Sequence, residues 1–399
     1  MHRCLAIPEI LHLICSQLRD DVVNWGDLPS RRSLAALATA SWAWHEPAIA
    51  GLWFEIEGLD TLVRCMPQDL WQRNDKQELV LRRPILRADM EVLSKYAGHI
   101  RYFIENEYPS PSLHHALLSH CQGPLLPRLK RLRWLTDGEC FSNIRFFLPR
   151  SLERLEILSE DQTNHEKLLN LLSSIPISFC SNITDLYVSF CDVSPGLPSA
   201  SRIDRFLPQW QSLSSLEIFG APPNALWCTS QMPNLRSLAV NLLESPNEPP
   251  PTSLSAYTSP HHSPIEELSI EKVTAISDIV GFFEAHKLTN IRSLYIEILP
   301  IQEGSSTATK VLLGQIASSC CNTLESFVLD HDSYNGPFPS IITPLLRFSN
   351  LKRVQFGLGR LTDVSDREIS RISSSWSSTV SLCIKSKNLP PIRLPPSQA

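Results

Sequence analysis

A six-residue pattern that recurs along most of the chain restricts its fold more than any other feature of the sequence. The pattern reads apolar-x-x-apolar-x-apolar, and its nine copies start 22 to 33 residues apart. The last apolar positions alternate with other residues, which is the period of a β-strand. Stretches between the copies, such as 276–283, carry apolar residues at helical spacing. The nine copies begin at Leu129, Leu152, Ile183, Leu213, Leu235, Ile265, Ile291, Leu324 and Leu351.

A repeated unit of one strand and one helix leaves apolar surface open until a neighbouring unit covers it. The sequence therefore predicts a repeat array that becomes longer with each added unit. At 399 residues the chain is too long for a single compact core, which usually holds about 100–150 residues, and a repeat array does not need one. The copies resemble leucine-rich repeats over about 125–385, and this resemblance implies an α/β solenoid with a curved parallel sheet. Weaker copies near 79–81, 100–103 and 379–384 leave the ends of the array open.

A doubly wound α/β domain is the competing fold, because it also alternates strands and helices. Nine similar strand cores without a Gly-rich first turn favour the solenoid. The position eight residues after each first apolar residue is Asn or Cys in regular leucine-rich repeats. Only Cys191 fits that rule here, so we expect irregular turns.

The first fifty residues predict three short helices. Ile7, Leu11, Ile14 and Leu18 form one apolar stripe at helical period, and Pro8 suits the first turn of that helix. We expect Ser33 to cap a second helix that runs to Trp44, and Pro47 to force a break before a third.

Residues 5–54 resemble an F-box of the type common in fungal proteins, on the strength of Ile7-Pro8-Glu9-Ile10-Leu11, the helix at 34–37 and the closing Leu52-Trp53. The resemblance implies docking onto a Skp-type adaptor, and through it onto a cullin, in a ubiquitin ligase. The alternative is a helical cap that covers the first repeats, in a repeat protein unconnected to ubiquitin. The residues expected to contact the adaptor are Ile7, Pro8, Leu11, Ile14, Leu18, Leu34, Leu37 and Trp53.

Composition excludes several classes of protein. With 36 Lys and Arg against 41 Asp and Glu, the net charge of −5 lacks the attraction to phosphate backbones on which nucleic-acid binders rely. We expect no membrane span, because no run approaches 18 apolar residues. The 11 cysteines are scattered and never spaced C-x-x-C, which favours the cytoplasm or the nucleus over an oxidising compartment.

No catalytic, phosphate-binding or metal-binding motif rises above chance, so we expect no enzyme activity, no cofactor and no metal. The expected partners are instead the Skp-type adaptor and an unknown target protein. The target would contact the strand residues that point away from the core. Arg131, Arg133 and Arg154 would form a cationic patch there, and Tyr187 and Tyr295 lie on the same face.

We expect four parts: an F-box-like helical module at 1–55, a linker with irregular first repeats at 56–124, the repeat solenoid at 125–385, and a Pro-rich tail at 386–399. The solenoid contains a Pro/Ser-rich loop at 245–264. We expect this loop to lack regular structure and the tail to be frayed.

Overall fold

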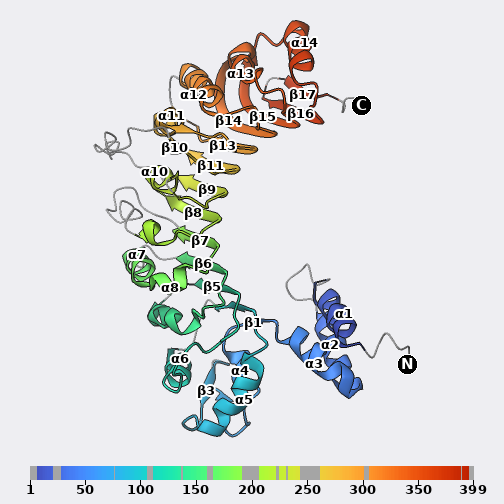
Figure 1. The fold of residues 1–399 in the computed structure, drawn as a ribbon, viewed down its shortest axis with the longest axis vertical. Coiled ribbons are helices and arrows are strands. Elements are labelled where there is room, and N and C mark those ends of the chain that lie inside the picture. Colours follow the sequence, from blue (N-terminus) through green and yellow to red (C-terminus); the bar gives the residue numbers. More distant parts are fainter. Residues whose placement is uncertain are drawn as a thin grey trace. The chain divides into compact units, whose positions relative to one another are not determined.

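The computed structural model describes residues 7–20, 28–75, 77–105, 111–135, 138–159, 165–190, 206–221, 224–230, 232–242, 261–300, 305–387 and 389–394. The chain divides into two compact units, Met1–Leu158 and Ser159–Ala399. Each unit is described by itself below, with the element labels of Figure 1.

The first unit opens with the three expected helices, α1 (Pro8–Asp20), α2 (Leu28–Ala40) and α3 (Trp42–Leu52). Helix α1 begins at the predicted proline. The other boundaries differ from the prediction: α2 starts before Ser33, the chain breaks at the extended residue Ser41, and Pro47 lies inside α3. Pro47 is the sixth residue of α3, beyond the first turn, so it removes one backbone hydrogen bond of that helix, and the burial of Trp44, Pro47 and Ala48 offsets the cost.

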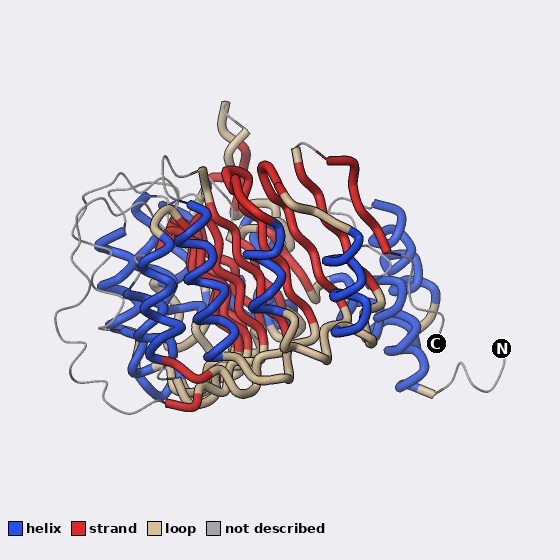
Figure 2. Tube along the Cα trace, turned by 90° about the horizontal axis from the view of Figure 1, so that it is seen from above, coloured by secondary structure: helices blue, strands red, loops and turns tan. Residues whose placement is uncertain are grey.

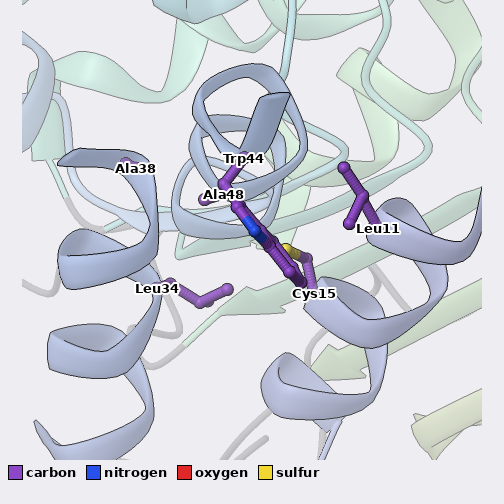
Figure 3. Packing of buried hydrophobic residues seen from close by; sticks show 6 residues of the cluster. All are labelled: Leu11, Cys15, Leu34, Ala38, Trp44 and Ala48. Atoms are coloured by element: carbon purple, nitrogen blue, oxygen red, sulfur yellow. The ribbon is translucent and has the colours of Figure 1, made fainter. Parts of the chain in front are cut away.

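These helices, called the α1–α3 module below, enclose a core of their own. The Trp44 side chain of α3 extends into the space between α1 and α2 (Figure 3). The core residues are Leu11, Cys15, Leu34, Ala38, Trp44 and Ala48.

The rest of the first unit contains a parallel ladder with the strand order β1 (Glu55–Glu57), β4 (Tyr102–Ile104), β5 (Arg131–Leu135) and β6 (Arg154–Ser159). The repeats therefore begin well before residue 125, and the weak copy near 100–103 is one of the ladder's strands. The copy at 79–81 is not, because β3 (Leu79–Leu81) pairs antiparallel with β2 (Trp71–Arg73). The helical segments of this part are α4 (Asp60–Val63), α5 (Arg87–Ala97), α6 (Pro111–Leu118) and a 3-10 stretch at Gly138–Phe147.

The second unit continues the repeat with parallel strands in chain order, which follow a curve with the helices on its outer side (Figures 1 and 2). The parallel strands are β7 (Asp185–Phe190), β8 (Ser215–Ala221), β9 (Ser237–Leu242), β11 (Glu267–Val273), β13 (Ser293–Ile298), β14 (Ser326–Pro337), β15 (Arg353–Thr362) and β16 (Ser381–Ser386). The helices are α7 (His165–Ser174), α8 (Ile177–Cys180), α10 (Asn224–Ser230), α11 (Ile276–Ala285), α12 (Ser305–Ser319), α13 (Phe338–Leu345) and α14 (Asp366–Ser375).

The repeat pattern marks the core correctly. Every residue at the three apolar positions of the nine copies is at most 2% exposed. Each such side chain stabilises the fold by about 1.5–3 kcal/mol relative to an exposed position. Strand order follows chain order inside each unit, as in a solenoid, whereas a doubly wound sheet reverses its order at a switch point. The chain is therefore an α/β protein with a leucine-rich-repeat-like parallel sheet.

Two expectations about irregular segments are wrong. Residues 389–394 are not frayed, because they form β17 (Leu389–Leu394), which pairs antiparallel with β16. An edge strand tolerates prolines because one side of its backbone has no neighbouring strand to which an N–H group would donate. The prolines Pro390 and Pro391 therefore fit in β17. Inside the Pro/Ser-rich loop, β10 (His261–His262) pairs with β12 (His286–Lys287). The rest of that loop from 245 to 260, and the tail from 395, lie outside the described residues.

Candidate interaction surfaces

The residues predicted to contact an adaptor divide into three groups. Leu11 and Leu34 lie inside the core of the α1–α3 module and so offer no surface to a partner in this conformation (Figure 3). Ile7 and Pro8 are exposed at the start of α1. The remaining four residues are partly buried. Ile14, Leu18 and Leu37 pack against the core of the module. The centroid of the Trp53 ring lies 4.7 Å from the centroid of the Tyr96 ring.

Two exposed apolar side chains of the module were missed by the sequence prediction. Leu13 of α1 is 68% exposed, and Trp42 at the start of α3 is 90% exposed. The Trp42 ring stacks on that of His45, with 5.8 Å between ring centroids and 1° between planes. Leu13 was detectable, because it falls outside the stripe of α1, on a face that an isolated amphipathic helix keeps polar.

The three predicted arginines do come together on the outward face of the first ladder. Arg131 pairs in register with Arg154 on the next strand, and Arg133 pairs in register with Glu156. The patch is not purely cationic, however, because Arg154 Nε donates to Glu156 Oε1 at 2.7 Å. We therefore describe it as a mixed arginine–glutamate surface.

The same surface continues onto β4 and β1. Tyr102 lies in register beside Arg131, and Glu55 lies in register beside Tyr102. Burial raises the pKa of Glu55, while Arg31, Arg19 and Arg131 act in the opposite direction. Burial also raises the pKa of the Tyr102 phenol, and the charges of Glu156 and Glu55 add to that rise. Acidic and basic groups of this face thus lie close enough to influence one another, and Glu55 and Tyr102 are partly buried among them.

The two predicted tyrosines lie far apart in the second unit, with strands β8, β9 and β11 between them. The centroid of the Tyr187 ring lies 5.4 Å from the centroid of the Phe219 ring. The Tyr295 hydroxyl donates to Asp330 Oδ2 at 3.4 Å. Burial raises the pKa of Tyr295 to about 12, with further contributions from Asp330, Glu297 and Glu271. The face around Tyr295 is therefore acidic, in contrast to that around Arg131.

We expect Asp330→Asn to stabilise the second unit at neutral pH. Burial raises the pKa of Asp330, so the folded state holds the proton more tightly than the unfolded chain and the charged form costs stability. Because Asp330 keeps contact with solvent, the gain should stay below about 1 kcal/mol. It should shrink as the pH falls through the raised pKa of Asp330 and vanish below the ordinary value of an aspartate, about 4.

Urea unfolding of both proteins from pH 4 to pH 7.5 measures this difference. Asn keeps an oxygen that can accept the Tyr295 hydrogen bond, so the substitution changes mainly the charge. If the gain in free energy of unfolding of Asp330→Asn became larger as the pH is lowered, the raised pKa of Asp330 would be contradicted.

Neither a metal centre nor a membrane span is visible in the described part of the chain. Among those residues, no group of three or more His, Cys, Asp or Glu side chains could hold a metal ion. Nor does any helix there combine the length and apolarity needed to cross a bilayer.

Comparison with known proteins gives matches among solved structures only. No protein-family model matches the chain, and no curated protein matches it. An internalin C2 from Listeria monocytogenes str. 4b F2365 matches at 16% identity and a TM-score of 0.32, over 64% of this chain and 94% of that one. The complex of Rad7 and Elc1 in yeast matches at 19% identity and a TM-score of 0.40, over 94% of this chain and 87% of that one. The fold assignment itself rests on the strand register described above.

Proposed function

We propose that this chain is the substrate-recognition subunit of a cullin–RING ubiquitin ligase of the SCF type. The α1–α3 module binds a Skp-type adaptor and through it a cullin, and the repeats bind a target protein. The chain performs no bond chemistry itself. It raises the effective concentration of the target beside the ligase.

The exposed apolar surface of the α1–α3 module carries this proposal. The module closes its core with Leu11, Leu34 and Trp44, yet leaves Trp42, Leu13 and Ile7 in solvent. Among the described residues, these are three of the six large apolar side chains that are exposed. Exposed apolar side chains in and beside one small helical module favour a docking role, and a tryptophan is a common anchor of protein interfaces.

The outward faces of the repeats support the second half of the proposal. They combine the arginine–glutamate surface around Arg131 with the acidic surface around Tyr295. Charges of both signs on a rigid sheet suit a protein target better than a nucleic acid. The proposal places the protein in the cytoplasm or the nucleus.

One observation favours a second function, that of a repeat scaffold unconnected to ubiquitin whose helices only cap the array. The carbonyl oxygen of Phe54, just after α3, accepts hydrogen bonds from the backbone N–H groups of Arg101 and Tyr102, both at 2.9 Å. The Trp53 ring also packs against Tyr96 beside this junction. The module is thus joined to the first repeats, as a cap must be.

Co-purification of the full chain with a Skp-type adaptor separates the two functions. We expect the wild type to retain the adaptor and Trp42→Ala to weaken its binding by at least about 2 kcal/mol, or about 30-fold. Leu13→Asp should weaken it as well, with little effect on melting because Leu13 already contacts solvent.

Val311→Asp on α12 is the matched control, because Val311 is 48% exposed but lies outside the module. It should retain the adaptor like the wild type. If the wild type retains no adaptor, the capping function replaces the proposal. If neither Trp42→Ala nor Leu13→Asp changes binding, the proposed surface is wrong.

A further inference from the structure

A cavity of about 250 Å³ in the first unit lies between the α1–α3 module and the segment that leads into β4. Helix α1 contributes His12, Ser16 and Arg19, and the segment before β4 contributes His99 and Arg101. Among the lining residues that the structure describes, none is acidic. The lining therefore combines two permanent cations with two imidazoles and a hydroxyl.

Arg101 is the best-defined cation of this cavity. Its Nη1 donates to the carbonyl oxygens of Gly98 at 2.8 Å and Ile100 at 3.2 Å, which fixes the guanidinium beside the end of α5. Within the described residues it forms no ion pair with a carboxylate. Burial lowers the pKa of Arg101, and the charge of Arg128 lowers it further. Two positive charges, on the half-buried Arg101 and on Arg128, create a positive potential here, and a positive potential attracts anions.

Arg19, which also lines the cavity, contacts an aromatic ring. Its guanidinium carbon lies 3.8 Å from the centroid of the Phe54 ring, a cation–π contact. Two carboxylates of described residues lie near the lining. Glu55 interacts electrostatically with Arg19, and the exposed Glu46 places Oε1 3.7 Å from Nε2 of His99.

The backbone around the cavity is well fixed. The Phe54 carbonyl oxygen receives the Arg101 and Tyr102 N–H groups, which ties the end of the module to β4. Gly51 allows α3 to lie close to α2, because a Cβ atom at this position would lie only 3.3 Å from Leu34 Cδ2. A fixed backbone reduces the conformational entropy that is lost when an anion binds to the side chains of this cavity.

We propose that this cavity binds a phosphate-class oxyanion, either inorganic phosphate or a phosphate monoester. A guanidinium presents a planar fork of N–H donors that matches phosphate oxygens, and the Ser16 hydroxyl and the imidazoles supply further donors. The volume lies below the range of about 300–1,000 Å³ that is common for drug-sized ligands, which suits a small anion or the phosphate group of a larger ligand. The lining residues given by the structure do not include Trp42, Leu13 or Ile7, the side chains of the proposed adaptor contact.

Isothermal titration calorimetry of the full chain with inorganic phosphate, at constant ionic strength, tests this proposal. We expect saturable binding to the wild type. Arg101→Gln and Arg19→Gln should each raise the dissociation constant about tenfold or more, because each removes a charge-assisted contact. Arg101→Lys keeps the charge but loses the fork, so its effect should be intermediate. Arg87→Gln is the matched control, since Arg87 is exposed on α5 and pairs with Glu91.

A phosphoserine peptide distinguishes the two sources of the anion. Tighter binding of the peptide than of phosphate indicates a phosphorylated side chain as the ligand, and weaker binding indicates a free small phosphate. Absence of saturable binding of both probes, up to about 10 mM, overturns the proposal. Unchanged binding in Arg101→Gln and Arg19→Gln, with melting temperatures like the wild type, overturns it as well. Adaptor retention, measured on the same proteins, should not change.

Discussion

Leu11→Asp is expected to unfold the α1–α3 module while the second unit stays folded. The Leu11 side chain is 1% exposed and belongs to the core of that module. Removal of a buried leucine side chain costs about 2–5 kcal/mol, and a buried carboxylate without a partner adds to that loss. Hydrogen exchange should therefore accelerate in α1, α2 and α3, and not in β8 to β16 of the second unit. Adaptor binding should be lost with the fold of the module.

Leu13→Asp is the matched control for this prediction. It makes the same chemical change two residues further along α1, at a position that is 68% exposed. We expect it to leave hydrogen exchange in the three helices unchanged, although the proposed function predicts that it weakens adaptor binding. Unchanged exchange in Leu11→Asp would mean that Leu11 faces solvent and that the core in Figure 3 is wrong.

The repeat strands could be predicted from sequence because their pattern carries redundant information. Three apolar positions in six residues, with two of them alternating, fix both the strand and its inward face. The same alternation shows which residues point outward. It correctly predicts that Arg131 and Arg154 lie side by side on the outward face. It could not show that Glu156 neutralises Arg154, because that depends on the side-chain conformation of two residues on one strand.

The first repeats could not be placed by this rule, because their strands are too short to carry the whole pattern. Strands β1 and β4 hold three residues each. Their pairing depends on neighbours far away in sequence, Phe103 with Ile56 on one side and with Leu132 on the other. Tertiary contacts, not local propensity, decide such elements.

The helical module shows a different limit of sequence reasoning. The stripe of α1 gave the correct apolar face, but periodicity does not show what covers that face. In the structure, α2 and α3 cover it, so Leu11 stabilises the module and cannot act as a contact in this conformation. The surface open to a partner instead includes Trp42, whose exposure follows from the break of the chain at Ser41.

Gly220 in β8 is the glycine whose replacement should harm the second unit most clearly. Its φ of +76° lies in the left-handed region, which costs other residues about 1–2 kcal/mol. A Cβ atom there would lie 2.5 Å from the carbonyl oxygen of Phe190, at the end of β7. The pairing of β8 with β9 also shifts register between Phe219 and Ala221. Backbone atoms of one strand therefore occupy the space that a side chain of the next would need.

We expect Gly220→Ala to lower the free energy of unfolding of the second unit by about 2–4 kcal/mol, because strain at positive φ and the clash with Phe190 act together. Urea unfolding followed by circular dichroism measures the loss, and hydrogen exchange in β7 and β8 locates it. Gly314→Ala is the matched control: it lies inside α12, and a Cβ atom there meets nothing within 4 Å. Alanine in a helix is favoured over glycine by about 0.5–1 kcal/mol, so this variant should be slightly stabilised. Equal stability of the two variants would show that β7 and β8 do not approach as closely at Gly220 as the structure has them.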